Sequence, residues 1–233
     1  KQRFRAVQTM GARNVAQAAS AAGVTSLIHM SAIGADAQSP SAYARTKALG
    51  EAEVFAAFPN AVVIRPSIIF GQGDGYFNLL GSLVRMLPVI PLLGSKTRFQ
   101  PIYVGDVAEA FVGAIEGKVK PGKVYELGGP EIETNRELHE RVLRDTLRNN
   151  LLVPVPAGVG KLMALPFALL PFKPLLTADQ VESLQADNVV SDAAIREGRT
   201  LAAFGVTPTP MEAILPTYLW RFMKNGQFDR QTA

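Results

Sequence analysis

The chain has 233 residues, of which 48% are hydrophobic and 19% charged, a composition typical of a soluble globular protein with a sizeable core. The formal net charge is +4, but the basic residues are dispersed, so the charge does not indicate nucleic-acid binding. The absence of cysteine excludes disulfides, a thiolate nucleophile and a cysteine metal site, and suits a reducing compartment. The two histidines, His29 and His139, lie far apart and predict no metal site.

The beginning of the chain predicts a long amphipathic helix. Apolar residues recur at steps of three to five across residues 4–22, and Gly23 follows as a C-terminal stop. The basic start at residues 1–5 runs directly into this pattern without an apolar signal core, so we interpret it as folded protein. Because no methionine opens the sequence, we expect a fragment or a processed product.

Two buried strands and a second helix are expected next. Residues 24–30 form an apolar run that ends in a loop of small residues, 31–34, which is typical of a strand in a parallel sheet. A helix is predicted over residues 42–57. Residues 61–66 are rich in β-branched side chains and predict a second buried strand, which Pro66 ends because proline cannot donate to the ladder.

A turn, two helices and a short strand follow. Residues 70–75 are rich in glycine and predict a turn, and residues 77–86 have a helical pattern. Residues 101–104 predict a short strand. Asp106 is expected to cap the next helix, with Glu109 reaching back to complete a capping box.

The remaining regular elements continue the alternation of strand and helix. Residues 123–127 predict a strand, and Thr134 to Glu137 form a capping-box pattern before a helix that runs to about residue 148. Strands that alternate with helices predict an α/β fold with a parallel sheet. The proline-bearing tail around Trp220 is expected to pack back as short helices.

Residues 151–176 differ from the rest of the chain. They are apolar and punctuated by prolines, with Lys161 and Lys173 as the charged residues. The prolines and the length argue against a membrane-spanning helix. Three interpretations remain open: the core of a substrate lobe, a surface for partner subunits, or a lipid-facing patch.

Four motifs occur in order over residues 11–71. They are Gly11-Ala12-Arg13-Asn14-Val15, Ile28-His29-Met30-Ser31, Tyr43-Ala44-Arg45-Thr46-Lys47 and Arg65-Pro66-Ser67-Ile68-Ile69-Phe70-Gly71. Three later stretches continue the series, at residues 100–108, 125–130 and 201–206. In this order the motifs resemble the extended or atypical short-chain dehydrogenase/reductase family, which is NAD-dependent epimerase/dehydratase-like. The later stretches resemble its branch of nucleotide-binding accessory subunits of respiratory complex I.

The resemblance implies a Rossmann-like, doubly wound parallel sheet with a smaller, α-rich C-terminal lobe. Family members begin with a strand, a glycine-rich turn and a helix that holds the cofactor diphosphate, and this sequence contains no such segment. We therefore expect the first three or four strands to be missing. Residues 1–128 are then the C-terminal part of the NAD(P)-binding domain, with 72–100 contributing to the substrate lobe, and residues 129–233 form a substrate or partner lobe.

The candidate catalytic residues are Tyr43, Lys47 and Ser31. Tyr43 and Lys47 are four residues apart, so they lie on one face of the predicted helix. A cationic lysine favours the phenolate, so Lys47 is expected to lower the pKa of Tyr43 toward a value useful for proton transfer. The resemblance implies that the tyrosine exchanges a proton with the substrate oxygen, that the lysine contacts the nicotinamide ribose, and that Ser31 hydrogen-bonds the reacting oxygen.

The resemblance also implies a set of cofactor-binding residues. It places Tyr43, Lys47, Arg65, Pro66 and Ser67 at the dinucleotide, although Pro66 equally serves to turn the chain. The residue that distinguishes NAD from NADP normally follows the second strand of the family fold, which this sequence lacks. The expected cofactor is therefore NADP(H) or NAD(H), and no metal is expected.

Several other polar residues have simpler structural explanations. Gln8 stands where the family often has asparagine, which weakens a fully catalytic role. Arg98 is better explained as solvated than as a contact to an anionic substrate, His29 as a core or lid residue, and His139 as solvent-facing. The glycines of residues 70–75 do not predict a diphosphate site, because the pattern shows no strand before them and no helix opening behind them.

Three functional hypotheses follow. The first is a dinucleotide-binding protein of the complex I accessory-subunit type, whose cofactor serves structure or assembly. The second is an active oxidoreductase or epimerase acting on a nucleotide sugar or a lipid-like, quinone-pathway carbonyl through Tyr43, Lys47 and Ser31. The third is a fragment that binds nothing and exposes strand edges that favour association.

The expected partners and location follow from the first hypothesis. The partners are a dinucleotide and either respiratory complex I subunits or another membrane-associated complex, with no nucleic acid. The expected location is the bacterial cytoplasm, peripheral to the inner membrane, or the mitochondrial matrix.

Overall fold

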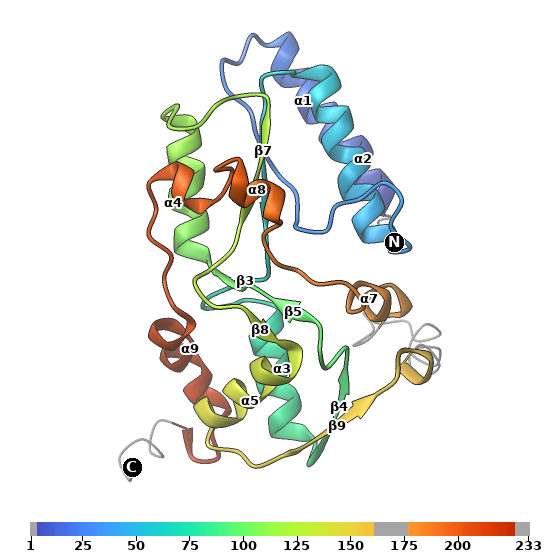
Figure 1. The fold of residues 1–233 in the computed structure, drawn as a ribbon, viewed down its shortest axis with the longest axis vertical. Helices are drawn as coiled ribbons and strands as arrows, with labels where there is room; N and C mark the ends of the chain where they lie inside the picture. The colour runs from blue at the N-terminus through green and yellow to red at the C-terminus, as the bar shows by residue number, and fades with distance from the viewer. Residues whose placement is uncertain (1–3, 161–176, 227–233) are drawn as a thin grey trace. The chain divides into compact units, whose positions relative to one another are not determined.

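The computed structural model describes residues 4–160 and 177–226, which form two compact units (Figure 1). The first unit is drawn from Lys1–Ser67, Gly105–Gly128 and Asn188–Pro208. The second is drawn from Ile68–Val104, Gly129–Asp187 and Thr209–Ala233. Residues 188–208 thus belong to the first unit, although they lie beyond the boundary expected at residue 128.

The first unit is built on a parallel sheet of three strands. Strand β2 (Val62–Pro66) lies between β1 (Ile28–Met30) and β7 (Lys123–Leu127), and both neighbours run parallel to it. In this register Met30 pairs with Ile64, and Ile64 pairs with Tyr125. The parallel sheet predicted from the sequence is confirmed, and so are the bounds of its central and last strands to within one residue.

Helices cover both sides of this sheet. A π-helical turn, η1 (Arg5–Gly11), continues into α1 (Ala12–Ala21), and α1 packs beside α2 (Ala42–Ala57) through a core that includes Ala16 and Val54. Figure 1 shows this helix pair on one side of β7 and α4 (Val104–Ile115) on the other. This double cover explains why consecutive β2 residues are buried instead of alternating.

Local chemistry sets the ends of the helices in the first unit. The first helix ends as predicted at Gly23, whose φ of 67° suits glycine. The amide N–H of Val24 donates back to the Ala19 carbonyl oxygen at 3.0 Å. Val24, the first residue of the strand predicted over 24–30, thus belongs to the helix cap, and β1 begins only at Ile28. The predicted helix 42–57 is confirmed, with Ser41 as its N-cap.

In its described residues, the second unit combines helices with three two-stranded sheets. Its main helices are α3 (Tyr76–Met86), α5 (Asn135–Asp145) and α9 (Met211–Leu219). Strands β3 (Ile69–Phe70) and β6 (Ile102–Tyr103) pair in parallel, as do β4 (Val89–Leu93) and β9 (Leu151–Val155), whereas β5 (Arg98–Phe99) and β8 (Glu133–Thr134) are antiparallel. The core contains Phe70, Phe77, Leu138, Met211 and Leu215.

The proline-bearing tail forms short helical segments, as predicted. They are α9 and η3 (Trp220–Phe222). Three further short helical segments precede this tail, namely α7 (Ala178–Ser183), α8 (Asp192–Arg196) and η2 (Leu201–Phe204). The capping box at Thr134 and Glu137 is also confirmed. In the part of the chain that the structure describes, no helix has the length and apolar character needed to cross a membrane.

The structure corrects several expectations about the second half of the chain. The apolar segment 151–176 begins with a strand, β9, that pairs with β4, and neither strand was predicted. Residues 161–176 of that segment lie outside the described residues. His139 is buried on α5 rather than solvent-facing, and its Nδ1 lies 2.7 Å from the Asn135 carbonyl oxygen. It shares the buried face of α5 with Leu138 and Val142, despite the charged sequence around it.

Two predicted roles of charged residues also change. Because α4 begins at Val104, Asp106 lies inside its first turn and is buried, so it is not the N-cap. Arg98 is not simply solvated, because its Nη2 lies 2.7 Å from Asp187 Oδ2 and its backbone N–H donates to Asp187 Oδ1. Asp187 is distant in sequence, so no local pattern indicated this pair.

Candidate functional site

Two of the three predicted catalytic residues, Ser31 and Lys47, lie at the carboxyl end of β1. Ser31 follows β1 directly, and its backbone N–H donates to the Ile64 carbonyl oxygen of β2 at 2.7 Å. Lys47, on α2, donates from Nζ to the Met30 carbonyl oxygen at 3.0 Å. The fold thus places Lys47 beside the end of β1, at the sheet edge where open α/β proteins bind their ligands.

Tyr43 lies one helical turn before Lys47 and is protonated at neutral pH. Burial raises the pKa of Tyr43 above its ordinary value, which is opposite to the lowering expected from the neighbouring lysine. Burial lowers the pKa of Lys47, and the charge of Glu51 opposes that shift. The Tyr43 ring also packs edge-on against Phe4, with centroids 5.9 Å apart. The expectation was wrong because desolvation of the phenol outweighs the lysine charge.

Ser31 presents a buried hydroxyl suited to a ligand oxygen. Only 3% of the residue is exposed, and among the described residues Oγ has no hydrogen-bond partner. A buried hydroxyl without a partner costs about 1–3 kcal/mol, so such groups usually have a functional explanation. The Ser31 hydroxyl and the Lys47 ammonium thus both lie at the carboxyl end of β1.

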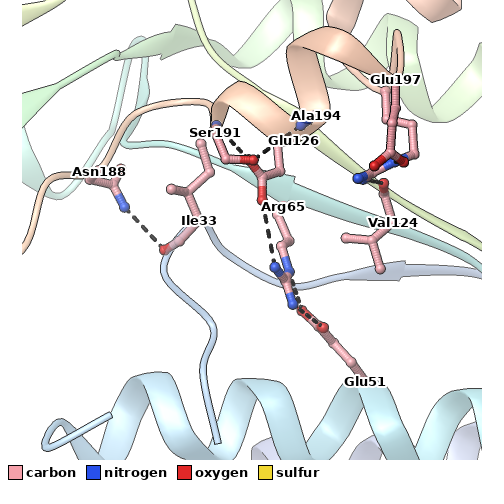
Figure 2. Close-up of polar contacts among 10 residues, drawn as sticks. Ile33, Glu51, Arg65, Val124, Glu126, Asn188, Ser191, Ala194 and Glu197 are labelled. Atoms are coloured by element: carbon pink, nitrogen blue, oxygen red, sulfur yellow. Dashed lines mark hydrogen bonds and ion pairs between the residues drawn. The ribbon is translucent and has the colours of Figure 1, made fainter. Parts of the chain in front are cut away.

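Arg65 is held by two buried carboxylates at the end of β2 (Figure 2). Its Nε and Nη2 donate to the two oxygens of Glu51 on α2 at 2.8 and 2.6 Å, and Nη1 lies 3.6 Å from Glu126 Oε1 on β7. Burial acts to lower the pKa of Arg65, but the hydrogen bonds and charges of Glu51 and Glu126 outweigh it and raise the pKa. The guanidinium is therefore permanently charged and bound within the protein.

Pro66 and Ser67 form hydrogen bonds to two loops, one at Ile33 and one at Asn188. Ser67 Oγ donates to Asn188 Oδ1 at 2.6 Å, and Asn188 Nδ2 donates to the Ile33 carbonyl oxygen at 3.1 Å, as Figure 2 shows for the second bond. The Ile33 N–H in turn donates to the Pro66 carbonyl oxygen at 3.0 Å. Of the five residues expected at the cofactor, Arg65, Pro66 and Ser67 thus make contacts inside the first unit.

Three important residues of this network were missed in the sequence. Glu51 follows Lys47 by four residues and so shares its helix face, a signal that was available. Glu126 stands inside an apolar strand, where a carboxylate needs a buried partner, and its Oε2 accepts from the Ser191 N–H at 2.8 Å. No sequence pattern indicated a role for Asn188, because its partners Ser67 and Ile33 are more than 100 residues away in the chain.

The glycine-rich loop has a strand before it and a helix behind it, contrary to expectation. Strand β3 precedes the loop and α3 follows it. However, Asp74 occupies the N–H groups that an anion would need. Its Oδ1 accepts from Phe77 N and Asn78 N at 2.6 and 3.3 Å, and its Oδ2 accepts from Tyr218 Oη at 2.5 Å. A phosphate would have to displace this carboxylate.

The remaining titratable group near the site is His29. Burial lowers its pKa, the charge of Lys47 lowers it further, and Glu51 opposes both effects. His29 is therefore neutral at physiological pH and half-buried on β1. Over residues 4–160 and 177–226, no group of three or more His, Asp or Glu side chains is arranged to hold a metal ion.

Comparison with known proteins identifies relatives of this chain. It is 37% identical over 202 residues to mouse NADH dehydrogenase (ubiquinone) 1 alpha subcomplex subunit 9, a mitochondrial protein, and the match covers 86% of this chain and 52% of the relative. It is 39% identical over 109 residues to the ceramide reductase of Caulobacter vibrioides, which covers 47% of this chain and 34% of that protein. The chain spans about half the length of the mouse relative.

The fold and the family are shown by two further matches. The Bordetella bronchiseptica enzyme WbmG, solved in complex with NAD, superposes with a TM-score of 0.63 at 17% identity, covering 92% of this chain and 64% of that enzyme. This likeness shows a shared fold, the Rossmann-like α/β fold predicted from the sequence. The family model of the RmlD substrate binding domain matches residues 1–159. The chain therefore belongs to the RmlD substrate binding domain family.

Proposed function

We propose that this chain is part of a dinucleotide-binding subunit that assembles with respiratory NADH dehydrogenase and holds NADP(H) or NAD(H) for structure or assembly. The match to the mouse mitochondrial subunit over 86% of the chain carries the proposal. The proposed location is peripheral to the membrane that contains this complex. Because the chain spans 52% of that relative, the activity and partners of the whole protein belong to the proposal.

Three side chains of the first unit would hold the reacting end of the dinucleotide. Lys47, fixed by the Met30 carbonyl, would contact the nicotinamide ribose together with Tyr43, and Ser31 would donate to a ligand oxygen. A bound dinucleotide would supply a hydride for transfer. The raised pKa of Tyr43 keeps the phenol protonated, so it acts as a hydrogen-bond donor and not as a base.

The test is nucleotide occupancy of the purified protein that contains this chain. Mass spectrometry of the native protein should identify one dinucleotide at near-stoichiometric level. Lys47→Gln should reduce that occupancy at least tenfold, because it removes a charge-assisted contact. Lys96→Gln is the matched control, since Lys96 is exposed in the second unit, and it should change nothing. A native protein without nucleotide, or equal occupancy in both variants, would contradict the proposal.

A second candidate is a reductase acting on a lipid-like carbonyl or a nucleotide sugar. The identity to the Caulobacter ceramide reductase favours it, together with the arrangement of Tyr43, Lys47 and Ser31. In this function the Tyr43 phenol gives its proton to the substrate oxygen as the carbonyl is reduced.

Tyr43→Phe separates the two functions. If the cofactor is structural, this variant keeps both its nucleotide and its assembly into the respiratory complex, and the native protein oxidises no NAD(P)H with any carbonyl substrate. If the protein is a reductase, the native form turns over a substrate and Tyr43→Phe loses at least a hundredfold in rate while retaining the cofactor.

A further inference from the structure

The second unit exposes an apolar sheet face formed by β4 and β9. Figure 1 shows the two strands side by side. Val89 pairs with Leu151, and Pro91 pairs with Val153, so these four residues share one face of the pair. Val89 is 46% exposed, Leu151 62% and Val153 39%. Parallel strands are normally covered on both faces, so this bare aliphatic face is unusual.

The turns next to these strands extend the apolar face. Met86 and Leu87, at the end of α3, and Leu147, after α5, are also exposed. Hydrogen bonds join the two turns, because the Leu151 N–H donates to the Pro88 carbonyl oxygen at 3.1 Å and Asn150 Nδ2 donates to the Val84 carbonyl oxygen at 2.9 Å. The exposed apolar residues of the strand pair and of the two adjoining turns, here called the β4–β9 surface, are Met86, Leu87, Val89, Pro91, Leu147, Leu151 and Val153.

Basic side chains border the β4–β9 surface. Arg85, Arg148 and Lys224 line a hollow beside Met86 and Leu147, and Arg144 lines the adjoining one. Within the described residues, Arg85, Arg144 and Lys224 have no ion-pair partner. Two acidic residues are nearby: Glu140 lies 3.6 Å from Arg136, which balances its charge, and Asp145 interacts electrostatically with Arg141. An aliphatic face is thus edged by a surplus of positive charge.

We infer that the β4–β9 surface docks on an anionic phospholipid bilayer. Aliphatic side chains gain free energy by entering the boundary between headgroups and acyl chains, and arginine and lysine at the rim pair with lipid phosphates. The charge complementarity identifies the lipid as anionic: a neutral membrane would gain only the aliphatic contribution. The inference rests on the second unit alone and does not depend on dinucleotide binding or on assembly with other subunits.

The test is co-sedimentation of the purified protein with vesicles. Binding should be tight to phosphatidylcholine vesicles that contain phosphatidylglycerol and weak to phosphatidylcholine alone. Each basic residue at an anionic surface is worth about fivefold in partition, so Arg85→Gln with Lys224→Gln should weaken binding roughly 25-fold. Raised salt should produce a similar loss.

Two further variant pairs complete the design. Lys96→Gln with Lys123→Gln removes the same charge from exposed positions outside the β4–β9 surface and should leave the partition within about twofold of native. Val89→Thr with Leu151→Thr keeps β-branched or strand-compatible side chains while reducing apolar area, and should weaken binding about tenfold. Thermal unfolding of each variant confirms that the exposed substitutions leave the fold intact.

Three outcomes would overturn the inference. One is failure of the native protein to bind anionic vesicles. Another is an equal loss in the Arg85/Lys224 and the Lys96/Lys123 variants, which would indicate attraction to net charge alone. The last is loss of capture by purified respiratory-complex subunits in the Val89/Leu151 variant with unchanged vesicle binding, which would assign the surface to a protein partner.

Discussion

Arg65 shows at the residue scale how burial and charge act together. Its guanidinium lies between Glu51 and Glu126, which are 6% and 8% exposed. Two carboxylates are tolerated at these buried positions because the same cation serves both, and because Glu126 also accepts from the Ser191 N–H. The network joins α2, β2, β7 and the residues before α8, so it fixes the end of the sheet where the candidate site lies.

Arg65→Met is expected to lower the free energy of unfolding by about 3–5 kcal/mol, because it leaves two buried carboxylates without a cation. Urea denaturation measures the change. Lys118→Met is the matched control: the Lys118–Glu116 pair is more than half exposed on both sides, so its loss should cost less than about 1 kcal/mol. Losses of similar size in the two variants would show that the Arg65 network does not stabilise the fold.

At the scale of elements, α2 depends on one close approach to the first helix. A Cβ placed on Gly50 would lie 2.3 Å from the Gln8 carbonyl oxygen. Any residue other than glycine would therefore clash with the η1 backbone at this position. This contact brings α2 against η1, and α2 carries Lys47, whose Nζ donates to the Met30 carbonyl oxygen at the end of β1. A Cβ on Gly11, in η1 itself, would lie 3.6 Å from its nearest neighbour, an ordinary contact.

The two glycines therefore predict opposite responses to alanine. Gly50→Ala should destabilise the protein by about 1–3 kcal/mol, because the backbones of α2 and η1 must separate. Gly11→Ala should be neutral or stabilise by up to about 1 kcal/mol, because alanine loses less backbone entropy in a helix. Thermal denaturation of both variants checks the pair, and a Gly50→Ala protein as stable as native would refute the close approach.

At the scale of the whole molecule, the chain builds each unit from stretches that are distant in sequence. Phe204, 1% exposed, packs edge-on against Tyr125 of β7 with centroids 5.1 Å apart. The first unit is therefore completed only by residues 188–208. Leu138, fully buried on α5, has the corresponding role in the core of the second unit.

Hydrogen exchange should reveal the two units separately. Phe204→Ala removes a large buried ring and is expected to cost about 3–5 kcal/mol, accelerating exchange in β7 far more than in α5. Leu138→Ala should cost about 2–5 kcal/mol and produce the reverse pattern. Uniform acceleration in both elements by either variant would mean that the molecule opens as one cooperative unit.

Local patterns in the sequence determined the elements that depend on near neighbours. The helix over residues 42–57, the strand over 123–127 and the capping box at Thr134 were predicted correctly, because periodicity, β-branched content and caps act within a few residues. The spacing of Tyr43 and Lys47 likewise placed both on one helix face. The family and the Rossmann-like fold followed from the order of short motifs.

Only the tertiary structure decided which residues surround each side chain. The pairing of β4 with β9, the burial of His139 and the contacts of Arg65 and Ser67 with Glu126 and Asn188 join segments far apart in the chain, which periodicity does not encode. The direction of the Tyr43 pKa was mispredicted for the same reason. The spacing to Lys47 is local, but desolvation depends on everything packed around the phenol, and that is set by the fold.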